Sequence, residues 1–150
     1  MNAVLSAAVR VLVAEDNEDH RFLTVRALRQ AGGEGVSVEA VGDGEQALDF
    51  LYRRHGYEDR ERPHLIVLDL KMPRLSGLQV LEAVKADEGL RSIPVVVLTS
   101  SDLARDVNDA YRLGTNSFVT KPAGTEVLKG LLAVGEYWLG GMTSLPQPPA

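Results

Sequence analysis

An apolar run that ends in a carboxylate is the feature that most limits how this chain can fold. Residues 65–68 read Leu-Ile-Val-Leu, Asp69 follows them directly, and a Lys-Met-Pro segment lies at 71–73. A strand this apolar is buried on both faces, as in a parallel sheet that helices cover on either side. Asp69 is therefore expected at the carboxyl end of such a sheet, where open α/β folds bind their ligands.

A second apolar segment, Val9–Ala14, ends in acidic residues in the same way, because Glu15 and Asp16 follow it. Three carboxylates are thus expected at one edge of one sheet. Two like charges about 4 Å apart repel by roughly 4 kcal/mol at an effective dielectric constant near 20, so a cation is expected among them. Mg²⁺, or Mn²⁺ in its place, suits the site because it is a hard ion that takes oxygen ligands. The alternative is three solvated acids at the starts of loops.

Two further apolar segments, at 93–98 and 116–120, also run into polar residues. These are Thr99 and Ser100 after the first segment, and Lys121 and Pro122 after the second. A hydroxyl and an ammonium thus join the acids at the same edge. This set suits phosphoryl transfer, in which catalysis is mostly positioning and neutralisation of charge on the equatorial oxygens. The carboxylate of Asp69 would be the nucleophile and would form an aspartyl phosphate.

Strand and helix patterns alternate five times along the chain. This alternation indicates an α/β fold, a doubly wound parallel sheet of five strands with helices on both faces. The remaining strand is expected at 36–41. Helices are expected to begin after Asn17, a plausible N-cap, and at Asp43 or Gly44, and to cover about 77–86, 103–113 and 125–139.

The length of 150 residues fits one domain. We expect an N-terminal extension at 1–8, the domain itself at 9–139, and a flexible tail rich in glycine and proline at 140–150. The absence of cysteine excludes disulfides, thiolate metal sites and cysteine nucleophiles. The net charge of −5 argues against nonspecific binding to nucleic acid. No apolar run is long enough to span a membrane and no signal peptide is recognisable, so a cytoplasmic location is expected.

Taken in order, these motifs resemble the receiver domain of response regulators in bacterial two-component signalling. The resemblance covers residues 9–139. It rests on Glu15-Asp16, on Asp69 with Lys71-Met72-Pro73 and the downstream Gly77, on Thr99-Ser100, and on Lys121-Pro122. It implies a flavodoxin-like receiver fold with strand order 2-1-3-4-5.

The resemblance also implies a role for each acidic residue. Asp69 corresponds to the phosphoacceptor. Asp16 and Asp69 correspond to ligands of Mg²⁺, with the main-chain carbonyl of Lys71 as a third ligand. Glu15 corresponds to the outer acid, where the family more often has aspartate, so it is expected to hold the metal through water.

The remaining motif residues correspond to the phosphoryl-binding and switch groups. Thr99, with Ser100 beside it, would supply the hydroxyl that bonds the phosphoryl group, and Lys121 would form an ion pair with it. Phe118 corresponds to the switch aromatic, although packing in the core could be its whole role. Pro73, Gly77 and Pro122 are expected to be structural, and the resemblance favours a cis bond before Pro122.

Three further stretches narrow the resemblance within the family. They are residues 50–54, the charged loop that ends at Arg62-Pro63, and Tyr137-Trp138-Leu139. They are similar to the single-domain regulators that serve phytochrome photoreceptor kinases. This implies a sensor histidine kinase, a bacteriophytochrome, as the phosphoryl donor, and an output by protein contact or relay.

Two other functions have to be weighed against this one. An aspartate-nucleophile phosphohydrolase of the haloacid dehalogenase class would carry a second aspartate two residues after the nucleophile, where this chain has Lys71. A receiver-like binding module that is never phosphorylated would not need the full set of acids, hydroxyl and lysine. The three histidines, at positions 20, 55 and 64, show no metal-ligand spacing and are expected to lie at the surface or to be satisfied locally.

The helices expected at 103–113 and 125–139 carry more apolar residues than one core face requires. The surplus predicts a homodimer surface that includes Val107, Tyr111, Leu128, Leu132, Tyr137 and Trp138. Exposed apolar patches often mark interfaces. The alternative is a wide core stripe.

Overall fold

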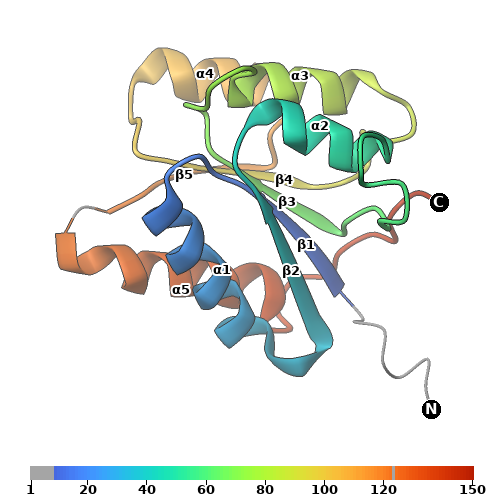
Figure 1. Ribbon diagram of the computed structural model, residues 1–150. Helices are drawn as coiled ribbons and strands as arrows, with labels where there is room; N and C mark the ends of the chain where they lie inside the picture. The colour runs from blue at the N-terminus through green and yellow to red at the C-terminus, as the bar shows by residue number, and fades with distance from the viewer. Residues whose placement is uncertain (1–8, 123) are drawn as a thin grey trace.

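The computed structural model describes residues 9–122 and 124–150, so the extension predicted at 1–8 lies outside the described residues. It contains one parallel sheet of five strands in the order β2-β1-β3-β4-β5 (Figure 1). The strands are β1 (Val9–Ala14), β2 (Val36–Val41), β3 (Leu65–Leu68), β4 (Val95–Thr99) and β5 (Ser117–Thr120). The predicted doubly wound α/β fold and its strand order are confirmed.

Helices cover both faces of this sheet. They are α1 (Glu18–Gly32), α2 (Gly44–Tyr52), α3 (Gly77–Ala86), α4 (Ala104–Arg112) and α5 (Val127–Leu139), with short 3₁₀ turns η2 (Gly33–Gly35) and η3 (Gly124–Glu126). Figure 1 shows α1 and α5 on one face and α2, α3 and α4 on the other. Within the described ranges, no helix is both long and apolar enough to cross a bilayer.

The alternation of side chains along the strands divides the core into two halves. In β1, Val11 and Val13 pack toward α1 and α5, whereas Leu12 and Ala14 pack toward α2, α3 and α4. Successive side chains of a strand point to opposite faces, and here both faces are covered. Because both faces are covered, the sequences of β1 and β3 are almost continuously apolar. The acidic residues that follow these two strands lie where the strands end at the edge of the core.

Three helices begin at side-chain caps soon after a strand ends. The Asn17 side chain accepts a hydrogen bond from the His20 N–H, and the Asp43 side chain accepts one from the Gln46 N–H. Ser76 forms a reciprocal capping box with Gln79 at the start of α3. Such caps satisfy N–H groups that the helix itself leaves free. They therefore fix where each helix leaves the carboxyl edge of the sheet.

Two strand boundaries differ from the sequence prediction. β4 begins at Val95 because Pro94 has no N–H to contribute to the ladder. β5 begins at Ser117, one residue after Asn116, whose side-chain Oδ1 accepts a hydrogen bond of 2.9 Å from the Val95 N–H.

Two other expectations concern the C-terminal third of the chain. No cis peptide bond occurs in the described ranges, so the bond before Pro122 is trans and the expectation of a cis bond was wrong. Trans is the intrinsically preferred form of an X–Pro bond by about 0.5–1 kcal/mol. Residues 140–150 form neither helix nor strand, but Leu145 packs against the core beneath α1 and α5, and the Ala150 carbonyl accepts a hydrogen bond from Arg62. The flexibility of this tail stays a prediction.

Candidate functional site

The carboxyl ends of β1, β3 and β4 open on a cavity of about 270 Å³. Its lining comes from the residues after these strands and from the start of α1. The lining residues are Glu15, Asp16, Asn17, His20, Asp69, Lys71, Thr99 and Ser100. The fold thus brings together acidic and hydroxyl groups that are up to 85 positions apart, from Glu15 to Ser100.

The three acids form one cluster in this cavity. Each of Glu15, Asp16 and Asp69 offers a carboxylate oxygen, and these oxygens lie within 4.8 Å of one another. Glu15 and Asp69 are buried, whereas Asp16 is exposed. Backbone N–H groups orient the buried pair: Asn17 donates to Glu15 Oε2 at 3.1 Å, and Lys71 donates to Asp69 Oδ1 at 3.4 Å. The cluster is therefore reachable from the exposed side of Asp16.

Lys121 brings a positive charge to this cluster from the end of β5. Its buried ammonium donates a hydrogen bond to Glu15 and lies 3.6 Å from Asp69 Oδ2. The Lys121 N–H donates to the Thr99 carbonyl at 2.7 Å, which ties the lysine to the neighbouring strand. A buried lysine is stable as an ion only when it is paired in this way.

One ammonium does not balance three neighbouring carboxylates. Burial raises the pKa of Glu15 to about 7, against the hydrogen bond from Lys121, which lowers it, and the nearby Asp69 carboxylate adds to the increase. The surplus of negative charge and the all-oxygen donor set fit a divalent cation such as Mg²⁺ or Mn²⁺, which would favour the ionised acids. The cluster thus has the chemistry of a divalent-metal site.

The predicted switch residues lie beside the cluster. Thr99 is 1% exposed and its Oγ1 accepts a long hydrogen bond of 3.4 Å from the Ser101 N–H, while Ser100 is exposed at the cavity. Phe118 is half-buried and packs against the core beneath α2, α3 and α4. Its N–H donates to the hydroxyl of Tyr111 at 3.2 Å. Packing of Phe118 is thus observed, and its role as a switch stays a prediction.

His20 is a residue of the site that the sequence pattern did not predict. Its Nδ1 lies 3.1 Å from Nζ of Lys121, and its side chain lines the cavity. A signal was present in the helix periodicity: His20 lies four positions before Thr24 and eight before Leu28, both of which are buried on the inner face of α1. The first turn of α1 therefore directs His20 toward the sheet edge, contrary to the expectation of a histidine outside the site.

The three predicted structural residues make close contacts around the site. A Cβ added to Gly77 would lie 2.1 Å from the carbonyl oxygen of Asp69, so α3 approaches the loop after β3 more closely than any other residue at this position would allow. The Pro73 carbonyl accepts a hydrogen bond of 2.8 Å from the Leu75 N–H within this loop. Pro122 packs against Gly130 of α5, where an added Cβ would lie 2.7 Å from the proline ring.

The residues of the predicted dimer surface divide into two groups. Tyr111, Leu128 and Tyr137 are exposed. Val107, Leu132 and Trp138 are half-buried, and the last two pack against the core beneath α1 and α5. Part of the apolar surplus is therefore core, and part of it faces outward from α4 and α5.

Comparison with known proteins places this geometry in a family. The response regulator receiver domain matches residues 11–133. A probable methanogenesis regulatory protein, FilR2 of Methanothrix harundinacea, is 42% identical over 131 residues, which are 87% of this chain and 83% of that protein.

Two solved structures resemble the whole fold. The crystal structure of the phosphorylated cyanobacterial phytochrome response regulator RcpA has a TM-score of 0.88 at 33% identity, and the match covers 94% of this chain and 100% of that one. The crystal structure of the Mn²⁺-bound form of response regulator Rcp1, a protein of Synechocystis sp., has a TM-score of 0.87 at 32% identity, over 93% of this chain and 99% of that one. The chain belongs to the response regulator receiver domain family, and it resembles the receivers of phytochrome systems.

Proposed function

We propose that this protein is a response regulator that accepts a phosphoryl group on Asp69 from a sensor histidine kinase. The observation that carries the proposal is the meeting of the Asp69 carboxylate with Glu15 and Asp16 in one open cavity, with the buried Lys121 ammonium beside them. Receiver domains are signalling phosphoacceptors, and this chain belongs to their family.

The proposed step is an in-line displacement at phosphorus. A carboxylate oxygen of Asp69 attacks the phosphorus of a phosphohistidine, an O–P bond forms, and the N–P bond breaks with its electron pair leaving on the imidazole nitrogen. Lys121 lies close enough to Asp69 to neutralise charge on the transferred oxygens, and Thr99 offers a hydroxyl at the neighbouring strand end. The product is an aspartyl phosphate.

The metal site is part of the same proposal. Asp16, Asp69 and the main-chain carbonyl of Lys71 would hold Mg²⁺ or Mn²⁺ directly, and Glu15 would act through water. When bound, the cation supplies positive charge for the phosphoryl oxygens. The donor set of the cluster and the Mn²⁺-bound form of the similar regulator Rcp1 support this assignment.

A phytochrome-type kinase, in particular a bacteriophytochrome, is the partner we propose. The similarity of fold to RcpA, a cyanobacterial phytochrome response regulator, supports it. FilR2, at 42% identity, is by its name a regulator of methanogenesis, so family membership by itself does not fix the kinase. Since such a kinase draws its phosphoryl group from ATP, the exchange would take place in the cytoplasm, and output would follow through protein contact or relay.

The assay that tests the proposal uses acetyl phosphate and Mg²⁺ with the purified protein. We expect an acid-stable and base-labile mass increase of one phosphoryl group, which Asp69→Asn abolishes, because an amide is a poor nucleophile. Asp19→Asn, an exposed acid of α1 outside the cavity, is the matched control. Continuous release of phosphate without a phosphorylated protein would indicate a phosphohydrolase, and no modification at all would indicate a binding module.

We also propose that the chain forms a homodimer through α4 and α5. The exposed side chains of Tyr111 on α4 and of Leu128 and Tyr137 on α5 support it, since exposed large apolar groups often mark interfaces. Sedimentation of the purified protein at high micromolar concentration tests this proposal independently of phosphorylation, and a strictly monomeric protein would contradict it.

A further inference from the structure

The segment between β3 and α3, residues 69–76, forms a closed loop, which we call the β3–α3 loop. Its two ends are tied together, because the Gly77 N–H donates a hydrogen bond of 2.8 Å to the Leu70 carbonyl. Lys71 lies inside this loop, and its main-chain carbonyl is the metal ligand proposed above. The position of that carbonyl therefore depends on how firmly the loop is held.

The β3–α3 loop lies against the first turn of α2. A Cβ added to Gly44, the first residue of this helix, would lie 2.2 Å from the Leu75 carbonyl oxygen, so the two backbones are in close contact. The preceding residue, Asp43, is buried and uses both carboxylate oxygens. Its Oδ1 accepts a hydrogen bond of 2.7 Å from the Gln46 N–H, and its Oδ2 lies 3.5 Å from Nε of Arg74. One carboxylate thus caps α2 and binds the loop.

The backbone of Arg74 adopts a conformation that needs support. Its φ angle is 69°, in the left-handed region that residues other than glycine rarely adopt. Arginine also lacks the short polar side chain with which asparagine or aspartate can stabilise this conformation locally. Such a conformation persists where the surrounding structure holds it. The ion pair with Asp43 is a contact from outside the loop that can do so.

We infer that Asp43 is a positioning residue for the phosphoryl-transfer site, because it holds Arg74 and thereby the Lys71 carbonyl. Arg74 lies three residues after Lys71 in the same closed loop, so a shift of Arg74 moves the loop around this carbonyl. Asp43 is not among the residues that line the carboxylate cavity, so its effect passes through the loop. This inference rests on the proposed function, since it concerns the ligand set proposed there.

The exposure of the ion pair indicates where its loss should be felt. The Arg74 side chain is 64% exposed and the Asp43 side chain is 12% exposed. Partly exposed pairs contribute little to the stability of a whole domain. Removal of the pair should therefore leave the fold intact and loosen the β3–α3 loop, whereas a merely structural pair would leave the metal site unchanged.

Two conservative substitutions remove the pair. Asp43→Asn keeps a side-chain oxygen that can cap α2, and Arg74→Gln removes only the charged end group. Each should raise the dissociation constant for Mn²⁺ about two- to fivefold, measured by electron paramagnetic resonance of the free ion. The double variant should bind no more weakly than the weaker single variant, because the pair is lost only once.

Amide hydrogen exchange gives a second measurement that needs neither metal nor phosphoryl group. In the metal-free protein, exchange in the peptide that covers residues 70–77 should be faster in both single variants than in the wild type. Exchange elsewhere should be unchanged, and thermal unfolding checks that each variant is folded. A loop that exchanges at the wild-type rate in both variants would overturn the inference.

Arg74→Gln separates positioning from a simple effect of charge. Loss of a positive charge near an acidic cluster should by itself strengthen the attraction for a cation. A loosened loop should weaken binding instead, and measurement at raised salt reduces the direct effect of charge. Weaker binding of Mn²⁺ by this variant is therefore the result that positioning predicts. Unchanged or tighter binding would overturn the inference.

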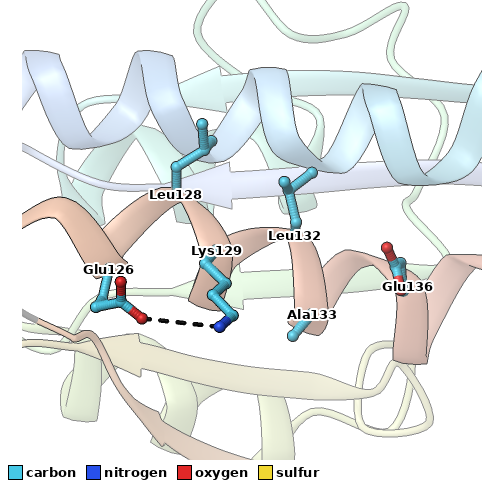
Figure 2. A pocket seen from close by; sticks show the side chains of 6 residues that line it. All are labelled: Glu126, Leu128, Lys129, Leu132, Ala133 and Glu136. Carbon is cyan, nitrogen blue, oxygen red and sulfur yellow. Dashed lines mark ion pairs between the residues drawn. The ribbon is translucent and has the colours of Figure 1, made fainter.

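An exposed ion pair outside the site provides matched controls. Lys129 contacts Glu126 at 4.0 Å on α5, as Figure 2 shows. Lys129→Gln and Glu126→Gln remove the same charges as the two test substitutions, so both should bind Mn²⁺ as the wild type does. Equal weakening by these controls would assign the effect to net charge and overturn the inference.

The same measurements distinguish this inference from the proposed function. A wild type that takes up neither Mn²⁺ nor a phosphoryl group would contradict the proposed function, and this inference with it. A wild type that takes up both, together with Asp43 and Arg74 variants that bind Mn²⁺ normally, would contradict this inference alone.

Discussion

Nδ1 of His20 lies 3.1 Å from Nζ of Lys121 beside the carboxylate cavity. An ammonium group can only donate hydrogen bonds, so Nδ1 must be the acceptor. In that tautomer the ring proton is on Nε2. Three side chains contact the Lys121 ammonium, namely those of Glu15, Asp69 and His20.

This contact predicts that His20 positions Lys121 for phosphoryl uptake. Replacement by leucine removes a hydrogen bond to a charged group, which is worth about 1.5–3 kcal/mol. If about half of that energy is expressed in the transition state, the rate of phosphorylation by acetyl phosphate should fall by roughly 3–10-fold. Single-turnover mass spectrometry at fixed Mg²⁺ measures this rate.

His20→Asn separates a positioning role from a merely structural one. The asparagine Oδ1 occupies nearly the place of the histidine Nδ1 and can accept the same hydrogen bond from Lys121. We expect this variant to recover most of the wild-type rate. Equal rates for the wild type and the leucine variant would show that Lys121 needs no support from His20.

The proposed metal site predicts that the substitution Asp16→Asn weakens the binding of a divalent metal ion. Replacing this exposed acid by asparagine removes a charged oxygen ligand without disturbing the core, so affinity for Mn²⁺ should fall by roughly tenfold or more. Electron paramagnetic resonance of free Mn²⁺ reports the affinity directly. Asp19→Asn, a neighbouring acid on α1 outside the cavity, should bind Mn²⁺ as the wild type does. Unchanged binding by the Asp16 variant would remove this residue from the ligand set.

The sequence predicted the strand ends well because the residues change from apolar to polar at the position where each strand ends. In β3 the apolar run stops at Leu68 and the acid follows at once, so the buried strand places Asp69 directly at its carboxyl end. The caps at Asn17 and Asp43 are equally local, since each side chain bonds to an N–H three positions away. Patterns of this kind depend on neighbouring residues only, and a single sequence contains them.

Features that depend on packing between distant segments could not be read in the same way. The contact of His20 with Lys121 joins residues 101 positions apart and depends on how the first turn of α1 leans over the sheet edge. Leu132 and Trp138 were assigned to a surface, but both pack partly against the core, because α1 lies against α5. The position of the tail beside Arg62 depends on contacts such as the hydrogen bond from Arg62 to the Ala150 carbonyl. No periodic pattern in the sequence predicts such a contact.

The close contacts of Gly77 at the start of α3 predict that any side chain at this position destabilises the fold. An alanine Cβ would lie 2.1 Å from the Asp69 carbonyl oxygen and 2.6 Å from Cα of Leu70, so the helix or the loop would have to shift. Overpacking of this kind costs about 1–3 kcal/mol of unfolding free energy. Urea unfolding of Gly77→Ala measures the loss. Gly35→Ala is the control, because no atom lies within 4 Å of the added Cβ at that position, and equal stability of the two variants would contradict the prediction.

The last prediction concerns the pH dependence of stability through His64. Its Nδ1 accepts a hydrogen bond of 3.0 Å from the Arg10 N–H, where the chain enters β3 beside β1. Burial lowers the pKa of His64, and the positive charge of Arg10 lowers it further, against a small opposing effect of Glu61. The folded protein therefore favours the neutral ring.

The sign of the effect follows from the difference between the folded and the unfolded chain. An unfolded histidine titrates near pH 6.5, and the folded-state pKa of His64 lies below that value. The contribution of neutral His64 to the stability of the fold is present in full above about pH 6.5. It is lost as the pH falls from there through the folded-state pKa, because the unfolded state binds the proton more tightly.

The variant His64→Asn tests this effect, because it keeps an acceptor for the Arg10 N–H but does not titrate. Urea unfolding at about pH 7.5 and about pH 5.5 should therefore show a smaller loss of stability for this variant than for the wild type. All other titrating groups are common to both proteins and cancel in the comparison, so equal losses would show that His64 is not buried as a neutral acceptor.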